Sequence, residues 1–312
     1  MRSRRVLEAL ALTASVGTTA ARAQDTEPAA HLLGYVQVRE TYRADNLTAT
    51  LNRARAGLEG SLTHGFTYRL LVEYEAGGSG TTPAGVSLRD AFVRWAAGRV
   101  NLTGGQFKTP FTREFITSIT EIETADRAAV VDSLAPKRDI GIMGGYDGGR
   151  YGIQVGVFNG EGQNRIANLD STNLIVARAT GRPLAPLELG ANLARYGADS
   201  ARYGIDGRLD YRGATIQAEF IWQDRPGDAP NDRGWYALAA YRVRPWVQLV
   251  LKQERFERPA LGADRLDLAT TGGVNVWFAG KRIRLLANYV SRRLGRPGVR
   301  AGTLIAQAQV RF

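Results

Sequence analysis

Arginine is the residue of this chain with the most evident chemistry. There are 37 Arg and only 4 Lys, against 30 Asp and Glu, so the formal net charge is +11. Many arginines fall on the polar side of alternating segments, among them Arg53, Arg55, Arg69, Arg94, Arg242 and Arg284. A planar guanidinium holds two oxygens of a phosphate-like group at once, so a surface lined by arginines favours anions. Alternatively, these arginines only balance carboxylates on neighbouring segments.

Catalytic chemistry has less support in the sequence. The chain lacks Cys, which excludes thiolate zinc sites, iron–sulfur clusters and a Cys nucleophile. His31 and His64 are the two histidines, and no G-x-S-x-G motif supplies a serine nucleophile. We therefore expect neither a metal nor a cofactor, and a hydrolase that uses only carboxylates stays open. Because arginine alternates instead of forming one basic stripe, we expect no nucleic-acid partner.

The elements that position these arginines are predicted strands. In 202–212, the side chains of Tyr203, Ile205 and Leu209 alternate with charged ones, and a strand places the two sets on opposite faces. Most predicted segments have about ten residues, which is the length of a tilted strand that crosses a bilayer. The sixteen segments lie near 33–43, 51–62, 66–75, 87–97, 99–109, 138–147, 150–159, 172–181, 186–196, 202–212, 214–224, 234–243, 246–256, 266–278, 281–291 and 303–312.

Short Gly-, Pro- and Asp-containing turns alternate with longer loops along the chain, which is typical of an outer-membrane barrel. Tyr and Trp also recur at the ends of the apolar faces, as in aromatic girdles. A soluble β-sandwich is the alternative, but its strands are usually only about five or six residues long. The sequence therefore predicts an all-β fold: a transmembrane antiparallel β-barrel of about sixteen strands, wide enough to enclose water.

The N-terminus resembles a secretory signal. Arg2, Arg4 and Arg5 precede a mostly apolar segment, and Ala21-Arg-Ala23 fits a small-x-small cleavage site. We expect residues 1–23 to be a signal peptide and residues 24–312 to be the barrel domain.

Three motifs in the middle of the chain resemble the phosphate-selective porin O and P family. They are Gly105-Gln-Phe-Lys-Thr-Pro-Phe111, Leu134-Ala-Pro-Lys-Arg-Asp-Ile-Gly141 and Gly152-Ile-Gln-Val-Gly-Val-Phe-Asn-Gly-Glu-Gly162. The resemblance implies a sixteen-stranded, anion-favouring channel of the bacterial outer membrane that is usually trimeric. The partners it implies are outer-membrane lipid, small anionic solutes such as phosphate, and two further copies of the chain in a homotrimer.

The longest connection, Pro110–Lys137, has 28 residues, and loops of this length are usually functional. Its apolar residues favour packing against a wall, so we expect it to fold into the barrel; the alternative is a flap on the outer rim. A short helix is possible at 125–131. The loop's carboxylates could oppose the wall arginines or pin the loop to the wall through ion pairs. We expect four basic residues in or beside the loop to line the anion pathway: Lys108, Arg113, Arg127 and Arg138.

These observations predict a non-enzymatic, water-filled channel that prefers anions. Phosphate and other small anions fit the arginine-rich interior equally well. The alternatives are an outer-membrane barrel hydrolase and a structural barrel that does not conduct.

Overall fold

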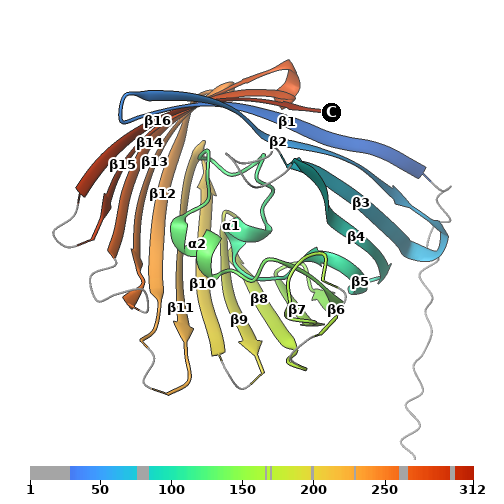
Figure 1. Cartoon of the computed structure of the whole chain (residues 1–312). Coiled ribbons are helices and arrows are strands. Elements are labelled where there is room, and N and C mark those ends of the chain that lie inside the picture. The colour runs from blue at the N-terminus through green and yellow to red at the C-terminus, as the bar shows by residue number, and fades with distance from the viewer. Residues whose placement is uncertain are drawn as a thin grey trace, which may run out of the picture.

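In the computed structural model, the described residues are 29–75, 84–165, 167–168, 171–197, 200–227, 230–259, 266–295 and 299–312. The expected signal peptide, residues 1–23, lies outside them. Within these ranges, sixteen strands form one closed antiparallel barrel (Figure 1). Each strand pairs with its neighbours in the chain, and β1 closes the barrel by pairing with β16.

The strands have the following bounds: β1 (Ala29–Arg43), β2 (Asn46–Ser61), β3 (Phe66–Glu75), β4 (Gly85–Ala97), β5 (Val100–Lys108), β6 (Arg138–Asp147), β7 (Tyr151–Phe158), β8 (Leu174–Leu184), β9 (Leu187–Tyr196), β10 (Ser200–Tyr211), β11 (Ala214–Asp224), β12 (Arg233–Arg244), β13 (Val247–Glu257), β14 (Leu266–Phe278), β15 (Ile283–Leu294) and β16 (Val299–Arg311). Two 3-10 turns, η1 (Thr63–Gly65) and η3 (Ala279–Lys281), join strands at the short-turn end.

All sixteen predicted segments are confirmed as strands, in the predicted order. The largest error is at the start of β2, which begins at Asn46 instead of Leu51. Ala44 and Asp45 alone form the turn between β1 and β2, both with positive φ, which is the conformation of a tight hairpin. The first connection at the long-loop end is therefore only two residues long.

Burial confirms the predicted alternation of faces. On β11, Thr215, Gln217 and Glu219 are buried inside the barrel, whereas Ile216 and Trp222 are exposed on its outer wall. Aromatic rings gather near the strand ends, as in the stacked pair Tyr203 and Trp222, with 4.9 Å between ring centroids. An apolar outer wall with aromatic ends matches the surface that a lipid bilayer requires. Among the described residues, no helix is long and apolar enough to cross a membrane.

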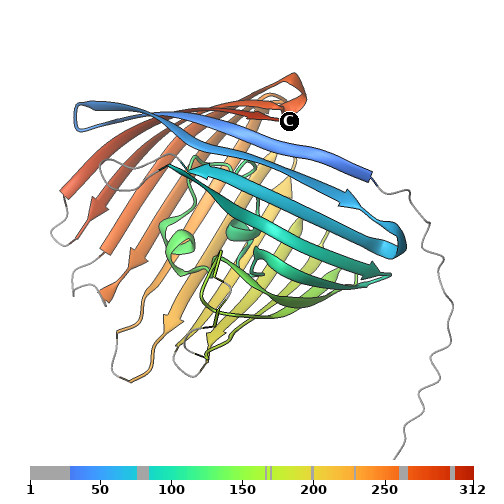
Figure 2. The ribbon, with the colours of Figure 1, turned by 45° about the vertical axis from the view of Figure 1, so that its right-hand side comes forward.

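The connection between β5 and β6 folds into the barrel, as predicted. It contains two short helices, α1 (Arg113–Ile116) and α2 (Ala129–Leu134), and both views place them inside the ring of strands (Figures 1 and 2). The expected helix at 125–131 thus lies a few residues later in the chain, and α1 is an additional one. We call residues 110–137 the inward loop.

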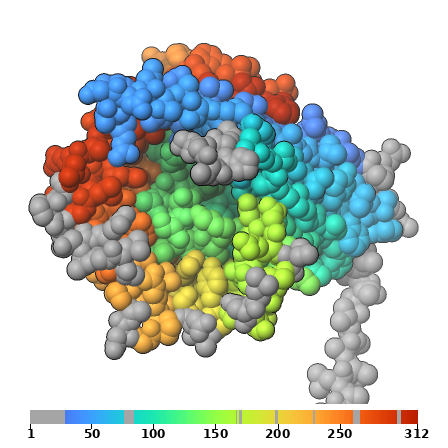
Figure 3. Space-filling view, viewed as in Figure 1, coloured from blue at the N-terminus to red at the C-terminus, as the bar shows by residue number. Residues whose placement is uncertain are grey.

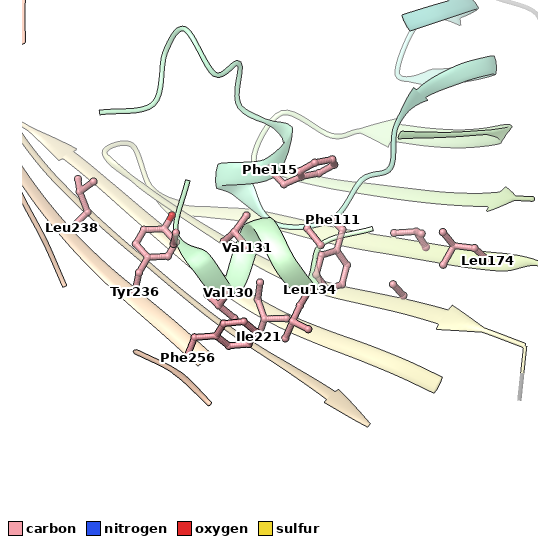
Figure 4. Packing of buried hydrophobic residues seen from close by; sticks show 14 of the residues in the cluster. Phe111, Phe115, Val130, Val131, Leu134, Leu174, Ile221, Tyr236, Leu238 and Phe256 are labelled. Atoms are coloured by element: carbon pink, nitrogen blue, oxygen red, sulfur yellow. The ribbon is translucent and has the colours of Figure 1, made fainter. Parts of the chain in front are cut away.

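The inward loop is held by an apolar cluster on one side of the barrel interior (Figure 4). Phe111, Val130 and Val131 of the loop are at most 1% exposed. They pack against apolar residues that point inward from β8, β11, β12 and β13, namely Leu174, Ile221, Tyr236, Leu238 and Phe256. These wall residues interrupt an otherwise polar inner face, and the loop covers them.

Candidate functional site

The chain turns into the barrel after Gly105 in β5. Gly105 has φ +126°, and a Cβ at this position would lie 2.2 Å from the carbonyl oxygen of Ala91, so only glycine fits. The strand keeps a continuous register with β4 and β6, and beyond Gly105 the Lys108 side chain faces the interior. Its ammonium donates hydrogen bonds to the carbonyl oxygens of Phe115 and Thr117, both at 2.9 Å, at the end of α1. Lys108 is therefore directed toward the inward loop without a bulge in β5.

Polar side chains of β9–β13 hold the first and last thirds of the loop through its backbone. Asn192 accepts a hydrogen bond from the Thr112 N–H at 3.0 Å. Glu219 accepts one from the N–H of Glu114, and Glu254 accepts one from the N–H of Ala129 at 2.7 Å. These carboxylates therefore stabilise the N-terminal turns of α1 and α2.

The middle of the loop lies on β14, β15 and β16. Arg284 donates hydrogen bonds to the carbonyl oxygens of Ile122, at 2.8 Å, and Glu123, at 3.0 Å. Asn275 reaches the same Glu123 carbonyl, and Asn288 accepts a hydrogen bond from the N–H of Ala125 at 2.8 Å. The loop therefore follows the inner wall over about half of the barrel's circumference, from β9 round to β16.

The three loop carboxylates that the sequence left with two roles are paired with wall arginines. Glu121 lies 3.3 Å from Arg311, Glu123 lies 2.9 Å from Arg208, and Asp126 lies 2.9 Å from Arg39. The geometry therefore matches the pinning role of these carboxylates.

Across from the covered wall, β1–β6 leave an opening between themselves and the edge of the loop. Figure 3 shows the mouth of the barrel hollowed, with the loop visible within it. A cavity of about 620 Å³ occupies the short-turn side of this opening and touches the loop edge at Ile116 and Ile119. The wall of this cavity includes Arg55, Lys108 and Arg138.

Basic side chains outnumber acidic ones around this opening. Glu73 pairs with Arg55, at 3.1 Å, and with Arg89, while Asp90 pairs with Arg138 at 2.7 Å. Lys108 and Arg127 pair with backbone carbonyls instead of carboxylates. Arg89 also pairs with Glu75 at 2.6 Å. Six cations thus face three carboxylates: Arg53, Arg55, Arg89, Lys108, Arg127 and Arg138 against Glu73, Glu75 and Asp90.

Phe115 gathers two of these cations. The Lys108 ammonium lies 5.6 Å and the Arg127 guanidinium 5.5 Å from the centroid of its ring. Both side chains also donate to the carbonyls at the end of α1, where the helix dipole favours positive charge. Lys108 and Arg127 therefore fix the edge of the loop as well as adding charge to the opening.

The ten sequence-predicted residues divide into three sets. The structure brings together Arg53, Arg55, Lys108, Arg127 and Arg138. Arg69 and Arg94 line the same cavity nearer the short-turn end, where Arg69 pairs with Glu59. Arg113 pairs with Glu188 on β9, and Arg242 and Arg284 line a separate cavity of about 340 Å³ beneath the loop.

Among the interior arginines that sequence reasoning missed are Arg89 and Arg39. Arg89 points inward because the register of β3 against β4 shifts at Leu71, which leaves Arg89 unpaired in a bulge beside Asp90. Arg39 was passed over although it alternates with Val38 and Glu40, and it holds Asp126 of the loop. The alternation signal was present for Arg39, whereas no pattern in the sequence marks the bulge at Arg89.

Buried acidic groups lie beneath α1. Burial raises the pKa of the Glu114 carboxyl to about 7, although nearby Lys252 acts in the opposite direction. Its Oε2 accepts a hydrogen bond from the N–H of Ala128 at 2.8 Å. In the described part of the chain, no three His, Cys, Asp or Glu side chains gather in a way that could hold a metal ion.

The fold of the chain is similar to that of several solved outer-membrane protein structures. The outer membrane channel DcaP of Acinetobacter baumannii is 12% identical, with a TM-score of 0.69, over 91% of this chain and 97% of that one. The anion-selective porin from Comamonas acidovorans is 16% identical, with a TM-score of 0.67, over 92% and 100%. The trimer form of OmpT from Vibrio cholerae is 13% identical, with a TM-score of 0.67, over the same shares.

No curated protein matches the chain. The sequence pattern of the family described as phosphate-selective porin O and P matches residues 34–213, which is more than half of the 312 residues. This range includes most of β1, all of β2–β10, the inward loop and all six cations of the opening. The chain therefore belongs to the phosphate-selective porin O and P family and is a β-barrel channel protein of the bacterial outer membrane.

Proposed function

We propose that this protein is an anion-preferring diffusion channel whose selective section is the opening between the inward loop and β1–β6. The observation that carries the proposal is the excess of six cations over three carboxylates at that opening. A positively charged constriction raises the local concentration of anions and opposes the entry of cations. Phosphate is one solute of this class, and other small anions fit the same chemistry.

The proposed site residues are the predicted arginines and Lys108, and we expect them to differ in how strongly each affects a passing ion. Arg53 has no close carboxylate: its guanidinium donates to Gln37 at 3.3 Å and lies 4.0 Å from Glu73. Arg55 lies 3.1 Å from Glu73, which also pairs with Arg89, whose second carboxylate partner is Glu75. Arg53 and Arg55 are therefore the residues whose charge acts most directly on a passing ion.

The direct test is the reversal potential of the channel in a planar bilayer under a potassium chloride gradient. We expect the sign that reports chloride preference. Arg53→Gln with Arg55→Gln moves the potential toward zero, because the opening loses two of its six cations. The matched control is Arg99→Gln with Arg212→Gln, because both arginines are exposed in turns at the short-turn end, away from the opening. Cation preference of the unmodified protein, or an equal shift in the control, overturns the proposal.

We also propose transport without catalysis, because His31 and His64 both lie at the short-turn end, where His31 faces Glu59 in the strand register. We propose that the protein assembles as a homotrimer, which the trimer form of the similar Vibrio cholerae structure supports. We also propose that residues 1–23 are cleaved, which leaves the barrel domain 24–312. Gel migration with and without heating tests the oligomer. Mass spectrometry of the protein purified from the outer membrane tests the cleavage, and a mass that still includes Met1 would contradict it.

A further inference from the structure

A second cavity lies on the long-loop side of the inward loop. It is enclosed by the loop and by the halves of β1 and β13–β16 nearest the long-loop end. Its volume is about 350 Å³. It has solvent-exposed aliphatic side chains in its wall: Leu294 is 46% exposed and Val299 is 78% exposed. Val290, Ala301 and Ile305 continue this aliphatic side. We call it the outer cavity.

The strand register shows that these side chains belong to the interior of the barrel and not to its lipid-facing wall. Leu294 pairs with Asp267 on one side and with Val299 on the other, and paired residues share a face. Asp267 is 5% exposed and interacts with Arg292, which also lines the outer cavity. The interior of such a barrel is normally polar, so aliphatic side chains exposed to water at this point need an explanation.

The rest of the outer cavity is positively charged. Five cationic side chains line it, against the carboxylates of Asp126 and Glu254. Asp126 is paired with Arg39, and Glu254 is paired with Lys252 at 3.0 Å. No hydrogen bond or ion pair of the Arg43 side chain is found within the part of the chain that the structure describes, and the hydrogen bonds of the Arg127 side chain go only to backbone carbonyls. The cations are Arg39, Arg43, Arg127, Lys252 and Arg292.

We propose that the outer cavity binds amphiphilic organic anions, namely carboxylates with a short hydrocarbon chain, before they enter the opening. This inference rests on the proposed anion preference and names the solute class that the channel favours. The carboxylate lies against Arg43 and Arg127, and the hydrocarbon chain lies against Val290, Leu294 and Val299. Small-molecule sites commonly combine an apolar wall with a few convergent polar groups, in volumes from about 300 Å³ upward. An inorganic anion makes no use of the aliphatic side.

The test compares acetate with hexanoate as blockers of the chloride current at pH 7, each added to the long-loop side of the membrane. Both carry the same charge, and they differ by four methylene groups. We expect half-maximal block by hexanoate at a concentration at least about tenfold lower than by acetate, because burial of methylene groups is favourable. Hexylammonium, which has a similar chain and the opposite charge, is expected not to block at that concentration.

The variant Val290→Thr, Val299→Thr and Leu294→Asn makes the aliphatic side polar with little change in size. We expect it to reduce the tenfold difference to less than threefold, with block by acetate unchanged. The matched control is Val100→Thr with Leu184→Asn, which changes exposed aliphatic residues at the short-turn end. If the triple variant does not assemble, Val290→Thr with Val299→Thr is expected to show the same trend, since valine and threonine have nearly the same shape.

Equal block by acetate and hexanoate, or block by hexylammonium as strong as by hexanoate, overturns the proposal. So does an equal loss of hexanoate block in the control, because hexanoate then acts through the lipid. The reversal potential of the unmodified channel is measured in the same membranes. Chloride preference without discrimination between the two carboxylates therefore removes this inference and leaves the proposed function intact.

Discussion

The two halves of the barrel interior use the same residue types for different purposes. The wall of β8–β16 lies beneath the inward loop, and its charged groups are occupied by the loop or by one another. Arg178 and Asp206 form an ion pair at 2.6 Å with side chains 2% and 0% exposed. The wall of β1–β6 stays open, and its cations exceed its carboxylates. An inward-facing arginine is therefore structural where the loop covers it and is available to ions where it does not.

The two walls differ in how much apolar surface they present to the loop. β11, β12 and β13 contribute Ile221, Leu238 and Phe256 to the interior, and the loop buries them. The open wall packs Tyr35 against Ile119 and Ile122 of the loop, which is a much smaller cluster. The loop therefore rests on the side with the larger apolar surface, because burial of that surface is the dominant favourable contribution to packing. The opening is what remains on the other side.

The largest expected effect follows from removal of the structure that divides the two halves. Deletion of residues 114–132 should raise single-channel conductance by roughly two- to threefold, because a sixteen-stranded barrel without the loop encloses a wide aqueous channel. The preference for anions should weaken, because ions no longer pass close to Arg53 and Arg55. Planar-bilayer recordings measure both quantities, and heat-dependent gel migration verifies assembly. An assembled deletion variant with unchanged conductance and selectivity would show that the loop is not the constriction.

The next effect concerns the covered wall alone. Arg178→Ala leaves Asp206 buried without its partner, which should lower the free energy of unfolding by about 3–5 kcal/mol. Arg178→Met with Asp206→Leu removes both charges and should remain close to the unmodified protein. Denaturant unfolding in detergent measures the stability, and the reversal potential should be unchanged in both variants. A shift of that potential in Arg178→Ala would contradict the division between the two walls.

The strands were predictable from the sequence, because an inside-polar barrel imposes a two-residue period on every strand. The same period indicated that Arg53, Arg55 and Arg284 face the interior. It could not show that Arg284 lies beneath the loop and that Arg53 does not, because that depends on contacts between residues more than 150 positions apart.

Two features of the candidate site were harder to find. The bulge that turns Arg89 inward leaves no mark in the pattern. The wall beneath the loop, in contrast, is marked in the sequence. Three consecutive strands place apolar side chains on their polar face, namely Ile221, Leu238 and Phe256. Such an interruption of the alternation predicts an apolar surface inside the barrel that another segment covers. It therefore indicates the side of the barrel on which the loop lies.

A matched pair of substitutions compares the two walls with the same chemical change. Arg284→Gln removes charge-assisted hydrogen bonds to the backbone carbonyls of residues 120, 122 and 123. It should lower the free energy of unfolding by about 1–3 kcal/mol and increase current fluctuations, because the middle of the loop is less restrained. Arg53→Gln should change the reversal potential with little effect on stability. Equal losses of stability in the two variants would mean that the open wall is as structural as the covered one.

The smallest effect is the response of the covered wall to pH. Burial raises the pKa of Glu114 from 4.5 to about 7, so the folded protein favours the protonated form. The stabilisation from this group is complete below about pH 4.5 and is lost as the pH rises through 7, with an upper limit of roughly 3 kcal/mol. Glu114→Gln keeps an oxygen for the N–H of Ala128 and removes the charge. It should therefore unfold at the same temperature as the unmodified protein at pH 4.5 and at a higher temperature at pH 8.

Glu121→Gln, on the exposed edge of the same loop, is the control and should keep the original pH dependence. If Glu114→Gln gives no advantage at pH 8, the carboxyl beneath α1 is solvated, and the loop covers that wall less tightly than the geometry indicates.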